Sequence, residues 1–129
     1  MLIISFAWTT PAFLARRKSA TRRDWDDVYA ARFKPGDLVQ AWDKTPRCRG
    51  AKRIGTIKIV SVKKESYNEV LVDDWEAEGF AYLDSIGAVC QLKPRLMTPA
   101  MLFQQWALSF DEDTCWVVRF EIVEVLKQE

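Results

Sequence analysis

The sequence predicts one α+β domain that spans residues 1–129, and three observations lead to this prediction. The length of 129 residues is close to the common size of one domain. The hydrophobic share of 49% is enough for one core. Apolar segments with strand patterns are separated by short helical segments, without an internal repeat, a low-complexity stretch or a linker.

The chain starts with an apolar segment at residues 2–8, which reads as a buried strand. Thr10 and Pro11 then predict a short helix over residues 12–16, with Thr10 as its cap and Pro11 at the first helical position. The apolar segment lacks a basic start and ends early, so it does not read as a signal segment. No apolar run reaches the ~20 residues that span a membrane, so we expect no membrane partner and a soluble, cytoplasmic protein.

A basic segment follows at residues 16–23 and is too polar to be buried whole. Residues 26–32 predict a second short helix. The Pro-Gly pair within residues 34–37 predicts a type II turn, because glycine accepts the positive φ that this turn requires. A strand at residues 38–42 and a basic loop at residues 44–52 come next.

Residues 53–63 predict the longest strand of the middle region. Ile57 and Ile59 fall on one face, whereas Val60 and Val62 have the opposite parity. A β-bulge, or burial on both faces, would explain this change of phase.

The second half starts with a short strand pattern at residues 67–72 and a helical pattern at residues 73–85. Asp73 and Glu76 have a weak version of capping-box spacing, and Gly87 suits the end of the helix.

A further helix is predicted from residues 98–108, followed by an acidic loop at residues 111–113. Residues 116–126 are apolar on both alternating faces, which predicts a central strand. We assign Trp116 and Cys115 to the core.

The charge is distributed unevenly along the chain. Residues 1–64 hold fifteen Lys and Arg and five Asp, a net charge of +10, whereas residues 65–129 have a net charge of −9. Such asymmetry suggests a polyanionic partner, such as RNA, for the basic half. The alternative is that the two halves pair with each other in the folded domain.

The sequence predicts neither a metal site nor a cofactor. The chain has no histidine, and its three cysteines, Cys48, Cys90 and Cys115, are far apart. Scattered cysteines fit a reducing compartment, and no glycine-rich phosphate loop is present.

The segment around Lys18 resembles the signature of the ASCH family, in which glycine, lysine, threonine and arginine occur at fixed spacing. Lys18, Thr21 and Arg23 match the last three positions, and Arg16 stands where glycine is usual. Three further segments are similar to the family's turn, middle helix and last strand: FKPGD at residues 33–37, EAEGF at residues 76–80 and WVVRFE at residues 116–121.

The resemblance implies a PUA-like mixed β-barrel with short flanking helices and a cleft between them. Members of the family are thought to bind RNA, some small bacterial members remove the acyl group from N4-acetylcytidine, and another member is described as a ribonuclease. In the amidohydrolases the working residues are the motif lysine and threonine and a helix glutamate. These positions correspond to Lys18, Thr21 and Glu78.

Each of these residues has an ordinary structural interpretation. Lys18 could be a neutral general base if its amine is desolvated and crowded by cations, or a solvated or phosphate-contacting surface lysine. Thr21 could be an activated nucleophile or a strand residue. Glu78 could be the acid or could hold the lysine, but a solvent-facing helix carboxylate is the alternative, and its neighbour Glu76 competes for the role.

The candidate binding residues are cations and nearby tryptophans. Arginines and lysines could contact phosphates without reading sequence, and a tryptophan could stack on a base, although each tryptophan alone more often belongs to a core. The set consists of Arg22, Arg23, Trp25, Trp42, Arg47, Arg49, Lys52 and Arg53. The sequence leaves three functions open: an amidohydrolase on a modified nucleoside, an RNA-binding module without catalysis, and a ribonuclease.

Overall fold

The computed structural model describes residues 1–66, 72–88, 90–92, 95–101 and 114–127. Five strands form one mixed sheet in the order β1-β3-β4-β7-β2, in which β1 and β3 are parallel and the other neighbours are antiparallel. The strands are β1 (Ile3–Ser5), β2 (Ala20–Arg23), β3 (Leu38–Trp42), β4 (Arg53–Ser66) and β7 (Thr114–Val125). A separate antiparallel pair consists of β5 (Cys90–Leu92) and β6 (Arg95–Met97).

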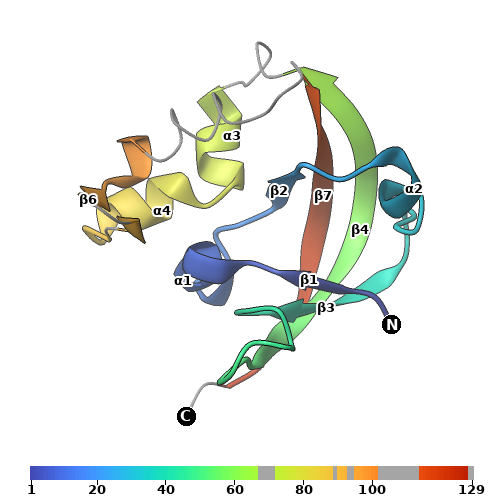
Figure 1. The fold of residues 1–129 in the computed structure, drawn as a ribbon, viewed down its shortest axis with the longest axis horizontal. Helices are drawn as coiled ribbons and strands as arrows, with labels where there is room; N and C mark the ends of the chain where they lie inside the picture. The colour runs from blue at the N-terminus through green and yellow to red at the C-terminus, as the bar shows by residue number, and fades with distance from the viewer. Residues whose placement is uncertain (67–71, 89, 93–94, 102–113, 128–129) are drawn as a thin grey trace.

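Short helices flank the sheet. They are η1 (Ala7–Thr9), α1 (Thr10–Leu14), α2 (Asp27–Ala30), α3 (Val72–Ala77) and α4 (Phe80–Ser85). In Figure 1, α2 lies on one side of the long strands β4 and β7, and α1, α3 and α4 lie on the other. No helix in the described part of the chain is long and apolar enough to cross a membrane.

The sheet bends into a half-barrel. Register shifts between Thr56 and Ile57 and between Ile59 and Ser61 mark bulges in β4, which increase local twist and bending. The edge strands β1 and β2 approach each other, and Arg23 Nη2 donates a hydrogen bond to the backbone oxygen of Ser5 across the gap. The inside is filled by an apolar core that includes Phe6, Phe13, Ile57 and Phe120.

Most predicted strands are confirmed. The strand at residues 38–42 has the predicted bounds, the one at 53–63 extends to Ser66, and the predicted central strand is β7, between β4 and β2. The predicted bulge in the middle strand is confirmed by its register shifts. Gly36 has φ of +91°, as the turn prediction requires, and Gly87 ends a helix with φ of +68°.

Other predictions are wrong in detail. The first strand covers only Ile3–Ser5, because the chain turns into η1. Thr10 is the first residue of α1 and not its cap, and its hydroxyl donates to Ala7 O. Trp116 is half-buried and donates through Nε1 to Asp27 Oδ1, so it does not belong to the core. Cys115 is buried, as predicted.

The helix predicted at residues 73–85 is two helices, α3 and α4, and Gly79 separates them with φ of +94°. Asp26 caps α2 by accepting a hydrogen bond from Tyr29 N, so the predicted helix at 26–32 is confirmed in shortened form. At the start of the helix predicted at 98–108, Thr98 Oγ1 accepts from Met101 N. Predictions for residues 67–71 and 102–113, including the acidic loop, fall outside the described residues.

Helix α1 ends in a Schellman motif built on an arginine. Arg17 N donates to Ala12 O and Arg16 N donates to Phe13 O, and Arg16 has φ of +60°. This backbone conformation usually belongs to glycine, because a Cβ atom costs ~1–2 kcal/mol there. The position is the one where the ASCH signature has glycine, and here an arginine takes the left-handed conformation.

We predict that Arg16→Gly raises the free energy of unfolding by roughly 1 kcal/mol, because it removes the side-chain penalty at positive φ. Arg16→Ala is the control, since it retains a Cβ atom and loses only the exposed guanidinium. Urea unfolding of the three proteins measures the difference. Equal stability of the glycine and alanine variants would show that the left-handed conformation carries no penalty here.

Candidate functional site

The turn after α1 delivers Lys18 to the interior. Ser19 N donates to Ala77 O at 2.7 Å, and Phe120 N donates to Ser19 O at 2.9 Å, so the residue after Lys18 is fixed between α3 and β7. The side chain of Lys18 is only 1% exposed. The basic segment is therefore not simply a solvated surface stretch.

The break between α3 and α4 brings Glu78 to the same place. A Cβ atom on Gly79 would lie 2.6 Å from Ala12 Cβ, so glycine is required for α1 to pack this closely. Lys18 Nζ donates to Glu78 O at 2.6 Å and lies 3.3 Å from Glu78 Oε2. Glu76 points elsewhere and forms an exposed bidentate pair with Arg17. Of the two candidate glutamates, only Glu78 joins Lys18.

Arg22 ties this pair to α3. Its Nη2 lies 2.5 Å from Asp74 Oδ2 and its Nη1 lies 3.2 Å from Glu78 Oε1. Asp74 also accepts a hydrogen bond from Arg119 Nη1 at 3.1 Å. Burial alone would raise the pKa of Asp74, but the hydrogen bonds from Arg22 and Arg119 bring it below its ordinary value. Asp74 is therefore held as an anion.

Positive charge outnumbers negative charge in this cluster. Lys18 and Arg22 pair with two carboxylates, Asp74 and Glu78. Arg23 adds a third positive charge that acts on Lys18 and Glu78, while Arg119 at the margin also lies 3.6 Å from Glu65. An arginine does not give up its proton at accessible pH, so the excess charge is relieved most easily at Lys18.

The pKa of Lys18 follows from this environment. Burial lowers the pKa of Lys18, the charges of Arg23 and Arg22 lower it further, and Glu78 opposes both effects. Lys18 therefore loses its proton at a lower pH than a solvated lysine.

Thr21 joins the cluster through Arg23. Its hydroxyl accepts a hydrogen bond from Arg23 Nε at 3.1 Å, and its side chain is buried. The guanidinium of Arg23 and the ammonium of Lys18 both lie against the ring of Phe6, at 5.9 Å and 5.6 Å from its centre. The three predicted catalytic residues thus belong to one buried cluster, in which Lys18 contacts Glu78 directly and Arg23 holds Thr21.

The predicted binding cations other than Arg23 divide into three groups. Arg22 is 1% exposed, and both its terminal nitrogens bond to carboxylates, so it has the geometry of a positioning residue. Arg53 is half-buried and engaged by Thr56 and Glu124. Arg47, Arg49 and Lys52 are exposed in the loop between β3 and β4, where they are free to meet solvent anions.

The tryptophans are partly accessible. Trp25 is half-buried, stacks on Phe33 at 4.5 Å and lines a recess together with Arg23. Trp42 is half-buried on β3 and donates through Nε1 to Gln40 Oε1. Trp25 and Arg23 thus line the same recess, and Arg23 also bonds to Thr21 in the cluster.

The charge asymmetry between the two halves is partly explained by internal pairing. Arg17, Lys18, Arg22 and Arg53 from the first half all pair with carboxylates of the second half. Sequence reasoning missed Asp74, whose i, i+4 spacing to Glu78 placed both on one side of a helix. It also missed Phe6, whose ring lies against Lys18 and Arg23 and which carried no sequence signal of its own.

Comparison with solved structures supports the predicted fold. A protein from Enterococcus faecalis V583, EF3133, described by the family model DUF984, matches with a TM-score of 0.55 at 18% identity. That match covers 97% of this chain and 78% of the other. The ASCH domain from Lactobacillus crispatus JV V101 matches with a TM-score of 0.50 at 21% identity over 89% of this chain and 70% of that one. No protein-family model and no curated protein matches the chain.

These likenesses define the class of fold. The half-barrel with short flanking helices is an α+β, PUA-like fold, as predicted. Within that class the chain has an ASCH-like fold.

We predict that Asp74→Ala lowers the free energy of unfolding by about 3 kcal/mol or more, because it leaves the buried Arg22 without its closest anion. Since the pKa of Asp74 is lowered by folding, the wild type keeps this contribution above the ordinary pKa of about 4 and loses it as the pH falls below that value. The difference between the two proteins should therefore shrink in acid. Denaturant unfolding at neutral and acid pH measures it.

Glu76→Ala is the matched control, because it removes an exposed carboxylate from the same helix. It should cost much less than Asp74→Ala. Equal losses in the two variants would contradict a special role for the buried cluster.

Proposed function

We propose that this domain, taken as residues 1–129, acts on RNA or a nucleoside, and that its chemistry is the hydrolysis of an acylated exocyclic amine of a pyrimidine. The observation that carries the proposal is the buried amine of Lys18 with Glu78 against it and an excess of cations around it. The ASCH-like fold is consistent with this class of ligand.

The reaction needs a base, a nucleophile and charge stabilisation. Neutral Lys18 takes a proton from water or from the Thr21 hydroxyl, and the resulting oxygen attacks the acyl carbon. Arg23, which donates to Thr21 Oγ1, supplies positive charge beside the developing oxyanion. The carbon–nitrogen bond then breaks, and the ring amine leaves with the proton from Lys18.

Glu78 completes this scheme. Its carboxylate holds the ammonium of Lys18 between the two proton transfers, and Arg22 fixes the carboxylate from the other oxygen. If Thr21 is the nucleophile, a water must release the acyl group from it in a second step. With N4-acetylcytidine the products are cytidine and acetate by either route.

We predict that Lys18→Ala abolishes release of acetate from N4-acetylcytidine, with a loss of at least about a hundredfold in kcat/KM. In the wild type, kcat/KM should rise with pH as Lys18 loses its proton, and this rise should lie below the pH at which a free lysine titrates. Product analysis over a pH series measures both effects.

The control is Lys63→Ala, because Lys63 is an exposed lysine on β4. Circular dichroism establishes whether the Lys18 variant folds, and Lys18→Met serves if the alanine variant does not. Unchanged turnover in a folded Lys18 variant would refute the proposed base.

A second candidate function is RNA binding without catalysis, and the exposed basic loop between β3 and β4 favours it. Arg47, Arg49 and Lys52 are solvent-facing cations, which neutralise phosphates irrespective of base sequence. A labelled single-stranded RNA also tests the third function, which is RNA cleavage. Cleavage of the strand by the wild type but not by Lys18→Ala would indicate a ribonuclease.

We predict that Arg47→Glu with Arg49→Glu weakens binding of a short single-stranded RNA and flattens its salt dependence. Loss of two phosphate contacts should reduce the slope of log K against log salt by about 1.4. Lys58→Glu, on the exposed side of β4, should leave the slope unchanged. Fluorescence anisotropy over a salt series gives the slopes, and binding that ignores ionic strength would count against this function.

A further inference from the structure

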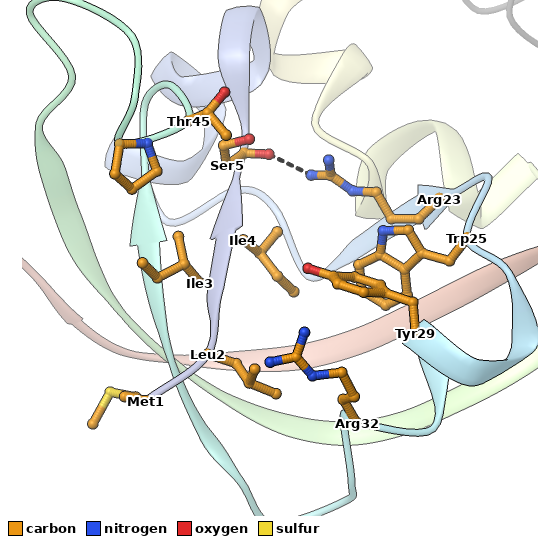
Figure 2. A pocket seen from close by; sticks show the side chains of 11 residues that line it. Met1, Leu2, Ile3, Ile4, Ser5, Arg23, Trp25, Tyr29, Arg32 and Thr45 are labelled. Carbon is orange, nitrogen blue, oxygen red and sulfur yellow. Dashed lines mark hydrogen bonds between the residues drawn. The ribbon is translucent and has the colours of Figure 1, made fainter.

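A recess lies between β1 and α2, at the open seam of the half-barrel (Figure 2). Its volume is about 410 Å³, within the range of small-ligand sites. Its lining comes from β1 and the two residues before it, from the end of β2, from α2 and the segments on either side of it, and from the loop after β3. Its walls include Ile3, Ser5, Arg23, Trp25, Tyr29 and Arg32.

One wall of the recess is aromatic. Trp25 and Tyr29 are in edge contact, with ring centres 5.1 Å apart, and Trp25 is supported from the core by Phe33. Both rings are half-buried, so each has a fixed position and an accessible surface. A rigid aromatic wall of this kind suits a planar ring, at a gain of ~1–3 kcal/mol for a stacked base.

Two guanidinium groups meet the aromatic wall. Arg32 lies over the ring of Tyr29 at 5.4 Å from its centre, and Arg23 closes the recess where it binds Ser5 O. In Figure 2 the polar ends of Arg23, Tyr29 and Arg32 all point toward β1. Among the residues that line the recess there is no Asp or Glu, so the cations are not neutralised from within its lining.

The third wall is the outer edge of β1. Gln40 N donates to Leu2 O and Phe6 N donates to Trp42 O, so the residues that flank β1, Leu2 and Phe6, bond to β3. Amide and carbonyl groups of successive strand residues alternate in direction, so those of Ile3 and Ser5 face away from β3. The hydrogen bond from Arg23 to Ser5 O confirms this direction. The edge therefore presents donors and an acceptor that can pair with the edge of a base.

We propose that this recess is a nucleotide-binding pocket, in which the base lies against Trp25 and Tyr29 and a phosphate binds Arg32. The proposal rests on the proposed function for its ligand class and adds that the ligand carries phosphate. Apolar and aromatic walls alone would suit an uncharged nucleoside, whereas two guanidiniums in a recess whose lining holds no carboxylate favour an anion.

Two features connect the pocket with the rest of the molecule. Thr45 and Pro46 at its rim start the basic loop, so a strand that inserts one base finds Arg47 and Arg49 close by in the chain. At its other end, Arg23 contacts both the pocket and the Thr21 hydroxyl. A bound base is thus one side chain away from the candidate nucleophile.

The test compares cytidine 5′-monophosphate, cytidine and inorganic phosphate in NMR titrations of the wild type, Arg32→Gln and Lys58→Gln. The monophosphate should bind the wild type about tenfold more tightly than cytidine or phosphate alone, because a charge-assisted contact adds to the stacking. Its amide shifts should map to Ile3, Ser5 and Tyr29. Arg32→Gln should remove most of the preference over cytidine, and Lys58→Gln should retain it.

The proposal is overturned if phosphate alone binds as tightly as the nucleotide, if cytidine and its monophosphate bind equally to the wild type, or if the shifts map elsewhere. Its failure is separable from that of the proposed hydrolysis. If acetate is released but nucleotide binding does not depend on Arg32, the pocket proposal fails and the hydrolysis proposal stands. If binding depends on Arg32 but no acetate is released, the hydrolysis proposal fails and the pocket proposal stands.

Discussion

The buried charge cluster between β2 and α3 is the constraint on which the site depends. Lys18 and Arg22 are each 1% exposed, and their charges are balanced by carboxylates that come from a different part of the chain. Removing such charges from water is costly, and only close hydrogen-bonded partners compensate for it. The cluster therefore fixes α3 against the sheet, and it also leaves one cation in excess. The same arrangement that holds the fold together lowers the pKa of Lys18.

Two backbone irregularities make this cluster possible. Arg16, with its positive φ, turns the chain from α1 into the segment that carries Lys18, and Gly79 lets Ala12 approach the end of α3. A regular helix through residues 73–85 would not provide this approach. Strain at Arg16 is thus tolerated where the geometry of the cluster requires the turn, a pattern common at functional sites.

The sequence predicts the strands better than it predicts the site. The alternation in β3, β4 and β7 reports burial directly, so their positions could be read from periodicity. The strand β2 was missed because three of its four residues are polar or charged, Thr21, Arg22 and Arg23. Arg22 pairs with Asp74 in α3, 52 residues away, and Arg23 with Ser5 on β1, 18 residues away. Local patterns carry no information on such long-range pairing. The resemblance to a signature named Lys18, Thr21 and Glu78, but only coordinates show Asp74 and Arg22 around them.

Arg23 decides how binding and chemistry could be linked. It spans the open seam of the half-barrel, with one nitrogen on Ser5 O and another on Thr21 Oγ1. Any ligand that draws its guanidinium toward the recess changes the hydrogen bond to Thr21 and the positive charge near Lys18. Because the charge of Arg23 lowers the pKa of Lys18, an anionic ligand near enough to offset the charge of Arg23 would raise the pKa of Lys18. An anionic ligand in the recess would thus change the pKa of Lys18, the amine that burial has desolvated. Arg23 is therefore the residue that couples the recess to the buried cluster.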